Sequence, residues 1–344
     1  MALESTSRDE LNVLNVQDEQ LRKVHVQDEE HVPQQKENSS SIDSEVNGIV
    51  SMHRKYTAWT HKARGFPTES ADEMRPPTLF QQMLAEFIGT GIVCLFGLGV
   101  NCASIICGAY AGLFPVGALW GITVTLAVLT TASVSGAHLN PAVSVAFAVL
   151  RPEHFPIWKL GPFCLAQFLG AIIGSAICYG CFANMIAIKE EMEGIVRGEL
   201  GSQVTSSPFN SYFPNPAFVG DTTGWTMTTV SAAGSFGIEA LGTGFLMFAV
   251  LCLTDARHQL RISGGTVAIG IGLTITIVVS VFAPIDQTSI NPARDFGPRL
   301  VTYALGWDTI SIPGPQSGMW TYIIGPVVGT VIGGALHDLM MYGL

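Results

Sequence analysis

The sequence predicts an all-α membrane protein with six transmembrane helices and two shorter re-entrant half-helices, arranged as two inverted repeats. Three observations support this fold class. The chain of 344 residues is 48% hydrophobic and only 13% charged, a composition too apolar for an ordinary soluble protein. Its apolar tracts are about 20 residues long, which is the length that spans a bilayer. The triplet Asn-Pro-Ala also follows a long apolar run in both halves.

Residues 1–79 precede the first apolar tract, and we expect them to form a cytoplasmic, largely disordered tail. Residues 1–50 are rich in Glu, Gln, Asp, Ser and Asn and lack apolar periodicity, which is typical of disorder. They contain no apolar run of the kind found in a signal peptide. We therefore expect the first spanning helix to direct insertion, and residues 80–344 to form the membrane domain.

Six apolar tracts after this tail are long enough to cross a bilayer. They cover approximately residues 80–100, 117–135, 160–184, 233–253, 264–283 and 320–340. Two shorter apolar stretches, 140–150 and 291–303, begin at the repeated triplets and cannot cross. The sequence thus predicts repeat one at about 80–184, repeat two at about 233–340, and an extracellular loop at 185–232. Because each repeat crosses an odd number of times, the second must be inverted relative to the first.

The Lys and Arg residues lie on one side of this arrangement. They cluster in residues 51–78 and in the loops near 151–159 and 257–261, whereas the loop at 101–116 is uncharged and the loop at 185–232 is mainly acidic. The positive-inside rule therefore places both termini in the cytoplasm. We expect a multi-pass protein of the plasma membrane, with an internal membrane as the alternative.

Each repeated triplet is predicted to begin a helix, because Asn is a strong N-cap and Pro suits the first helical position. The triplets are Asn140-Pro141-Ala142 and Asn291-Pro292-Ala293. A helix that begins inside a membrane leaves backbone N–H groups that only protein or a water-filled cavity can satisfy. Two such starts of opposite orientation would bring two positive helix ends together. That arrangement suits neutral hydroxylic molecules and opposes protons and cations.

Several polar side chains beside these segments are candidate site residues. Glu86 in AEFIGTG and Glu239 in IEALGTG open the first span of each half. Such intramembrane carboxylates can relay protons. We favour a structural role in which each accepts backbone hydrogen bonds and holds the re-entrant loop of its own half. His138 is a possible pH sensor, but we expect it to hold its loop by hydrogen bonding, and we expect Asp295 to orient the structure around Arg294.

The sequence predicts no metal site, no cofactor and no enzymatic activity. The seven cysteines lie mostly in or beside apolar tracts, without the spacing of a metal site, and we expect them to be buried. No nucleophile–base pair stands out, and the net charge of -10 leaves no basic patch for nucleic acid. A third triplet, Asn215-Pro216-Ala217, lies in a polar stretch and is expected to form an extracellular turn.

The segments SGAHLNPAVS and INPARDFGP, together with Glu86, Glu239 and Gln167, resemble the major intrinsic proteins, the aquaporin and aquaglyceroporin family. The resemblance covers about residues 80–340. It implies the aquaporin fold and a homotetramer with one pore per subunit. It also implies a selectivity filter of four residues outward of the paired triplets. The family pattern places this filter at Trp120, Val279, Thr288 and Arg294.

These filter residues resemble most closely the glycerol-conducting branch of the family. Val279 stands where water-selective members carry a histidine, and Trp120 and Asp295 match glycerol-conducting members, as does FPNP in the long loop. Thr288 departs from them, because the bacterial facilitators carry a phenylalanine there. The ring would offer the hydrogen-bond donors of Arg294 opposite an apolar Trp120 wall, which suits a small polyol.

The resemblance therefore implies a passive channel in the lipid bilayer for glycerol and other small neutral solutes, with water, that excludes protons and ions. In aquaporin-type pores this exclusion is generally attributed to half-helix dipoles and an arginine. One alternative is a water or hydrogen peroxide channel with little glycerol flux, and urea is a further permeant to consider. Another is an alternating-access secondary transporter, since inverted repeats and broken helices occur there too.

Overall fold

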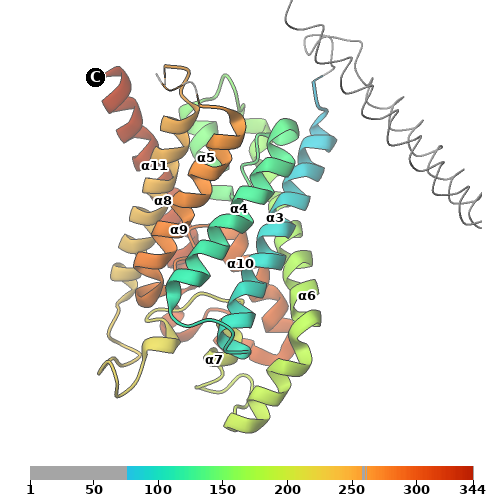
Figure 1. The fold of residues 1–344 in the computed structure, drawn as a ribbon, viewed down its shortest axis with the longest axis vertical. Coiled ribbons are helices and arrows are strands. Elements are labelled where there is room, and N and C mark those ends of the chain that lie inside the picture. The colour runs from blue at the N-terminus through green and yellow to red at the C-terminus, as the bar shows by residue number, and fades with distance from the viewer. Residues whose placement is uncertain (1–75, 258–259, 261, 344) are drawn as a thin grey trace, which may run out of the picture. The chain divides into compact units, whose positions relative to one another are not determined.

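The computed structural model describes residues 76–257, 260 and 262–343. The compact unit Pro77–Leu344 contains all of the helices discussed below. The tail predicted for residues 1–79 lies outside the described residues except for its last few. Within this unit the long helices run side by side (Figure 1).

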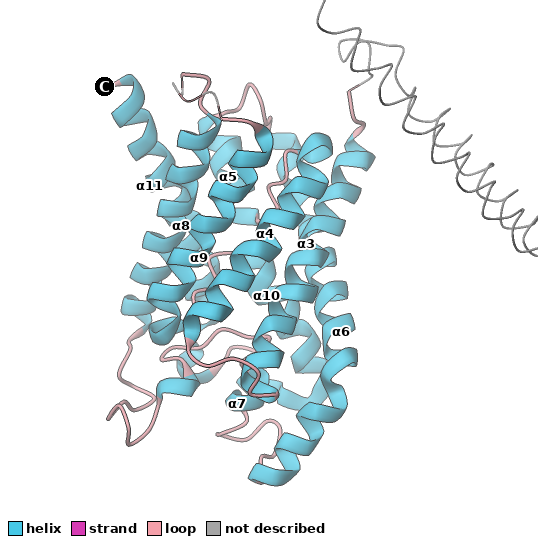
Figure 2. Ribbon diagram, viewed as in Figure 1, coloured by secondary structure: helices cyan, strands magenta, loops and turns pink. Residues whose placement is uncertain are grey.

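Six helices are long and apolar enough to cross a membrane. They are α3 (Leu79–Asn101), α4 (Leu113–Ser135), α6 (Leu160–Glu193), α8 (Ala232–Thr254), α9 (Gly264–Asp286) and α11 (Thr321–Tyr342). Figure 2 shows helices joined by loops, and no strand is found in the described part of the chain. The predicted all-α fold class is therefore confirmed.

The helix α6 extends well beyond the end predicted for the third span. That prediction stopped near residue 184, whereas the helix continues to Glu193. Its added residues, MIAIKEEME, become charged but include many strong helix formers. Hydropathy alone indicated only the apolar part of this helix, and the remainder projects below the other helices in Figure 1.

Two short helices lie inside the bundle and begin at the repeated triplets. They are α5 (Pro141–Leu150) and α10 (Pro292–Thr302). The end of α5 lies near the end of α11, because Arg151 forms an ion pair with Asp338. The segment after α10 lies near the far end of α6, because the carbonyl of Leu305 accepts a hydrogen bond from Arg197. The two short helices therefore point toward opposite ends of the bundle, as inverted repeats require.

Close helix contacts at small residues repeat in the two halves. A side chain at Gly174 of α6 would clash with the carbonyl of Gly91 in α3, and one at Gly333 of α11 would clash with the carbonyl of Gly244 in α8. Small residues let helices approach closely in a membrane, where the hydrophobic effect does not drive their association. The α3–α6 and α8–α11 pairs are thus equivalent, and they form walls around the short helices.

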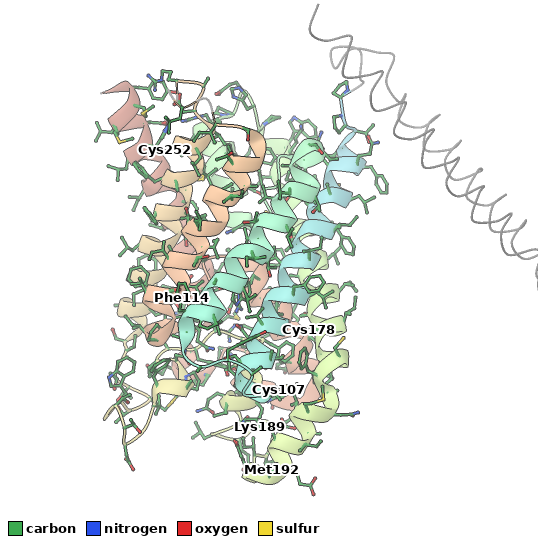
Figure 3. All side chains as sticks on the ribbon, viewed as in Figure 1. Cys107, Phe114, Cys178, Lys189, Met192 and Cys252 are labelled. Carbon is green, nitrogen blue, oxygen red and sulfur yellow. The ribbon has the colours of Figure 1, made fainter. Side chains whose placement is uncertain are left out.

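The cysteines follow the expectation of burial only in part. All seven are free, and burial is found for Cys94, Cys102 and Cys178. Cys107 and Cys181 are exposed, so the expectation is wrong for these two, which lie on the outside of the bundle. Figure 3 shows Cys107 and Cys252 near opposite ends of the molecule. In the described part of the chain, no cluster of His, Cys, Asp or Glu side chains could hold a metal ion.

Candidate functional site

The two triplets cap the short helices as their sequence predicts. The Asn140 side-chain oxygen accepts a hydrogen bond from the Ala142 N–H at 2.9 Å. The Asn291 oxygen accepts from the N–H groups of Ala293 at 3.0 Å and Arg294 at 3.2 Å. In both helices Pro occupies the first position, where no N–H is needed. Each asparagine therefore satisfies orphan donors at the start of a buried helix.

The same asparagines bring the two helix starts together. Asn140 Nδ2 donates to the carbonyl of Ile290, and Asn291 Nδ2 donates to the carbonyl of Leu139, both at 2.8 Å. Each amide has a second N–H, and both asparagines line a cavity of about 300 Å³, which we call the inner cavity. The positive ends of two helices and two amides thus meet beside this cavity.

The buried glutamates hold the two loops that lead into the short helices. Glu86 accepts hydrogen bonds from the backbone N–H groups of His138 at 3.0 Å and Leu139 at 2.7 Å. Glu239 accepts from the N–H groups of Ser289 and Ile290, both at 2.6 Å. The acceptors are equivalent in the two halves, because in each case the donors are the two residues before the triplet. Both carboxylates are fully buried.

The first loop has additional side-chain supports. Gln167 Nε2 donates to Glu86 at 2.7 Å and to the Ser144 hydroxyl at 3.0 Å. His138 Nδ1 lies 3.1 Å from the same hydroxyl, and its ring stacks on Phe147 with centroids 4.6 Å apart. His138 also lines the inner cavity. The structure thus joins Glu86, Gln167 and His138 in one network that fixes the loop.

These loops have an unusual backbone at equivalent positions. Ala137 and Leu139 have φ values of 52° and 51°, and Thr288 and Ile290 have 48° and 47°. Left-handed residues other than Gly cost about 1–3 kcal/mol each and persist only where their surroundings fix them. Here the glutamates bind the N–H of the left-handed residue directly before each triplet. The loops are therefore held in shape by the two carboxylates.

A second cavity, of about 220 Å³, meets the inner cavity at four residues. We call it the outer cavity. The residues that line both are Trp120, Val279, Thr288 and Arg294. These are the four residues that the family pattern indicated as a filter, and we call them the junction ring. That these four residues act as a selectivity filter stays a prediction.

The junction ring has a polar side and an apolar side. Arg294 Nη1 donates to the carbonyl of Phe209 at 3.2 Å, and its guanidinium carbon lies 4.9 Å from the centre of the Trp120 ring. Val279 adds an apolar wall, and Thr288 adds a short polar residue. In the described part of the chain, no carboxylate forms an ion pair with Arg294. The two cavities together form a passage through the junction ring. The positive charge of Arg294 therefore faces this passage without a direct ion-pair partner.

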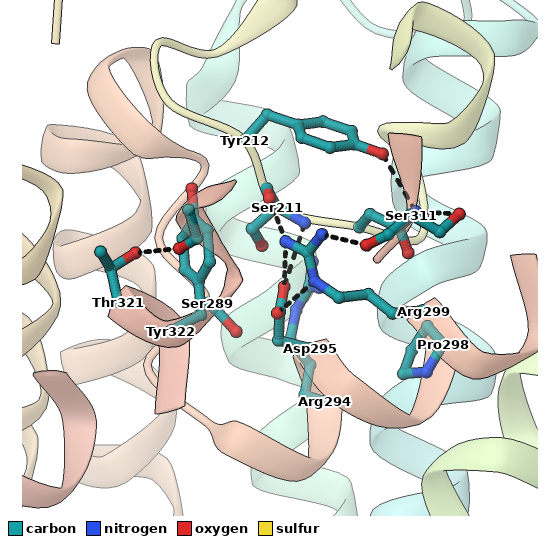
Figure 4. Close-up of polar contacts among 12 residues, drawn as sticks. Ser211, Tyr212, Ser289, Arg294, Asp295, Pro298, Arg299, Ser311, Thr321 and Tyr322 are labelled. Atoms are coloured by element: carbon teal, nitrogen blue, oxygen red, sulfur yellow. Dashed lines mark hydrogen bonds and ion pairs between the residues drawn. The ribbon is translucent and has the colours of Figure 1, made fainter. Parts of the chain in front are cut away.

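Asp295 is directed away from the ring and toward a second arginine. Arg299 Nε donates to Asp295 at 2.6 Å, and Arg299 also donates to the carbonyls of Ser211 and Ser311. The Ser211 N–H donates to Asp295 at 3.1 Å. Figure 4 shows this arrangement, in which the Asp295–Arg299 pair joins α10 to the loop around Ser211. The pair fixes the loop that also supplies the carbonyl for Arg294.

Two supporting residues were not identified from the sequence. The side-chain oxygen of Asn101 accepts a hydrogen bond from Trp120 Nε1 at 2.9 Å. Asp286 accepts from the Thr288 N–H at 3.0 Å. Each is a buried polar residue at the end of an apolar span. Polar residues in such places often have specific partners, and this is the signal that could have found them.

The third triplet has a larger role than the expected turn. Asn215 caps η4 (Pro216–Phe218) by accepting from the Ala217 N–H at 3.0 Å. Its Nδ2 donates to the carbonyl of Ala283 at 2.8 Å, and Asn215 lines the outer cavity. The chemistry of the cap is the same as in the paired triplets. Because this triplet follows a polar stretch and not an apolar span, the sequence predicted only a turn at this position.

Comparison with known proteins agrees with this geometry. The family model described as major intrinsic protein matches residues 73–337. The glycerol uptake facilitator protein of Pseudomonas aeruginosa is 35% identical over 260 residues, covering 76% of this chain and 87% of that protein. The Escherichia coli protein of the same name is 33% identical over 258 residues, covering 74% and 86%.

A propanediol uptake facilitator of Salmonella typhimurium is 32% identical over 262 residues, covering 76% of this chain and 93% of that protein. The X-ray structure of the aquaglyceroporin from Plasmodium falciparum is similar, with a TM-score of 0.65 and 23% identity. The match covers 77% of this chain and 98% of that one. At this identity the structural likeness supports the fold.

Proposed function

This chain belongs to the major intrinsic protein family, and we propose that it is a passive transmembrane channel for glycerol and other small neutral solutes that also conducts water. The observation that carries the proposal is the junction ring, where two cavities meet at Trp120, Val279, Thr288 and Arg294. The names of the curated relatives, which are uptake facilitators for glycerol or propanediol, support this class of solute.

The chemistry of the junction ring suits a small polyol. Arg294 supplies fixed N–H donors for hydroxyl groups, whereas Trp120 and Val279 supply a surface for the C–H edge of the same molecule. Val279 is smaller and less polar than a histidine, so the ring has room for a carbon backbone. Water also fits, and we include hydrogen peroxide and urea as candidate permeants.

Ions and protons are excluded by two features in series. The first is the charge of Arg294, which repels cations at the junction ring. The second is the meeting point of α5 and α10, where two helix N-termini and the amides of Asn140 and Asn291 form a positive, donor-rich region. A solute oxygen can accept hydrogen bonds there, whereas the positive helix ends and the amide donors repel a cation.

The arrangement of the glutamates argues against an ion-coupled transporter. Both side-chain oxygens of Glu86 and both of Glu239 accept backbone hydrogen bonds from the loops. A coupling ion would have to compete with these bonds and release the strained loops.

A water or peroxide channel with little glycerol flux is the second candidate function. Thr288 is the residue that favours it, because bacterial facilitators carry a phenylalanine at this position.

The organisation around the channel completes the proposal. We propose a homotetramer in the plasma membrane with one pore per subunit, with residues 1–79 as a cytoplasmic tail and residues 80–344 as the channel domain. The start of α3 and the end of α11 lie at the same end of the bundle (Figure 1), which agrees with both termini on one side. Large apolar residues that remain exposed on the long helices, such as Phe96, Ile122 and Leu273, would contact lipid or neighbouring subunits.

The direct test is the permeability of proteoliposomes that contain the full chain. Stopped-flow light scattering would compare water and glycerol entry with those of empty vesicles. We expect fast glycerol entry that does not saturate and does not respond to a proton or sodium gradient. Saturating, gradient-dependent uptake would indicate a transporter, and water flux without glycerol flux would indicate the second candidate.

A further inference from the structure

We infer that Asn101 is a positioning residue that sets the selectivity of the junction ring by holding its apolar wall, Trp120, and supporting its charged wall, Arg294. The inference rests on the proposed function, because it concerns the same passage. Asn101 is the last residue of α3 and lines the outer cavity. It belongs to neither the paired triplets nor the ring, and its role follows from three contacts.

The first contact fixes the indole of Trp120. Asn101 Oδ1 accepts the hydrogen bond of Trp120 Nε1 at 2.9 Å. This N–H is the only polar hydrogen-bonding group of a tryptophan side chain. Because it is bound to Asn101, Trp120 presents its apolar ring atoms to the passage. The same ring lies against Gly97, where any added side chain would clash with it.

Gly97 and Asn101 are one helical turn apart on α3, so they share a face of the helix. Gly97 supports the plane of the indole, and Asn101 holds its polar edge. Together they fix both the position and the rotation of Trp120. If the hydrogen bond to Asn101 were lost, Trp120 would still be supported by Gly97, but its N–H would no longer be restrained.

The second and third contacts connect Asn101 to Arg294. Asn101 Nδ2 donates to the carbonyl of Pro208 at 3.0 Å. The next carbonyl along the chain, that of Phe209, accepts the hydrogen bond of Arg294 Nη1 at 3.2 Å. One amide therefore holds the apolar wall through its oxygen and the support of the charged wall through its nitrogen. Among short side chains only asparagine has both an acceptor and a donor of this kind.

The consequence for selectivity follows from the freed groups. Without Asn101, the indole N–H would turn toward water or a passing hydroxyl, and the Phe209 carbonyl would lose an anchor for its segment. The apolar wall would then gain a donor, and Arg294 would be held less firmly. A polyol, which needs one apolar and one polar edge, would suffer more than water, which needs no apolar edge.

The test compares Asn101→Leu with the unmodified chain in proteoliposomes. We expect the ratio of glycerol to water permeability to fall by about three- to tenfold, the range expected for the loss of one or two hydrogen bonds. Ser104→Ala is the matched control, because Ser104 lies on the same cavity wall but forms none of these three contacts. An unchanged ratio in Asn101→Leu, or an equal fall in the control, would overturn the inference.

A double-mutant cycle separates positioning from a general structural effect. Trp120→Phe removes the indole N–H, so Asn101→Leu should change the permeability ratio less in that background than alone. Fully multiplicative effects would mean that Asn101 acts independently of Trp120 and would overturn the inference. If Asn101→Leu does not insert, Asn101→Ser replaces it in both comparisons, because serine is too short to bridge the two partners.

The same cycle distinguishes this inference from the proposed function. If the unmodified chain conducts water but no glycerol, the proposed function fails. The coupling between Asn101 and Trp120 is then measured from the ratio of urea to water permeability. A coupled change in that ratio would support Asn101 as a positioning residue, and independent changes would overturn it.

Discussion

Asn140 and Asn291 each donate a side-chain hydrogen bond to the backbone carbonyl that directly precedes the other. The bonds run to Ile290 and Leu139, and both measure 2.8 Å. Each asparagine also caps its own helix with the oxygen of the same amide. The amides therefore join the two repeats at a single point through two equivalent hydrogen bonds.

Replacing either asparagine with serine should separate these two roles. Serine caps helices about as well as asparagine, but it lacks the amide N–H that reaches the opposite carbonyl. We expect Asn140→Ser and Asn291→Ser each to lower the free energy of unfolding by about 1–3 kcal/mol, the cost of leaving the buried carbonyl of Ile290 or Leu139 without its donor. Thermal unfolding in detergent, followed by tryptophan fluorescence, would measure it. A large loss in only one variant would contradict the symmetry of the connection.

The size and polarity of the junction ring can be changed by a pair of substitutions. Val279→His with Trp120→Phe should narrow the ring and add a polar group where Val279 now offers an apolar wall. Glycerol permeability should fall by at least about tenfold, since a pocket contact for one or two carbons is worth roughly 1–3 kcal/mol. Water permeability should change little. An equal loss of both fluxes, measured by stopped-flow light scattering, would show that these residues do not form the selective ring.

The sequence was sufficient to predict the elements whose signals are local. Six apolar tracts of spanning length became six helices, and Asn-Pro-Ala, which combines a cap with a first-position proline, correctly marked the starts of α5 and α10. The length of α6 was underestimated, because hydropathy detects the membrane-embedded part of a helix but not its continuation into water.

The supports of the site depend on contacts between distant parts of the chain. The bond from Trp120 to Asn101 and the bond from Arg294 to the Phe209 carbonyl are made only after α3, α4 and the long loop have come together. A backbone carbonyl, moreover, carries no sequence signal at all. The family pattern indicated the ring positions, and the place of Asn101 and Asp286 at the ends of apolar spans marked them as polar residues of interest, but their partners could be identified only in the structure.

The two buried glutamates should be structural acceptors, and their amide analogues test this. In Glu239→Gln the amide nitrogen would face an N–H donor of Ser289 or Ile290, so one backbone N–H would lose its partner. Leaving a buried donor unpaired costs about 1–3 kcal/mol, and we expect this fall in the free energy of unfolding for Glu239→Gln and for Glu86→Gln. Thermal unfolding in detergent would measure it.

The control for this pair is Glu193→Gln at the exposed end of α6. Glu193 forms an ion pair with Lys189 at 2.6 Å, with nearly half of its side chain exposed. Exposed pairs contribute roughly 0–1 kcal/mol, so this variant should unfold almost like the unmodified protein. Stable folding of the two amide variants, together with the loss of a proton flux present in the unmodified protein, would instead identify the glutamates as a proton relay.

The charge of Arg294 should be one of two barriers to cations, and its removal reveals the strength of the other. Arg294→Val removes the guanidinium and leaves the two helix N-termini at Asn140 and Asn291 intact. Vesicles with a pH-sensitive dye inside and an imposed proton gradient would report any leak. We expect a measurable proton or cation leak together with retained water flux, because the ring would lose its only arginine while the passage stays open. If Arg294→Val conducts water but leaks neither protons nor cations, the meeting point of α5 and α10 is sufficient to exclude these ions. Arg294 would then serve mainly to bind hydroxyl groups.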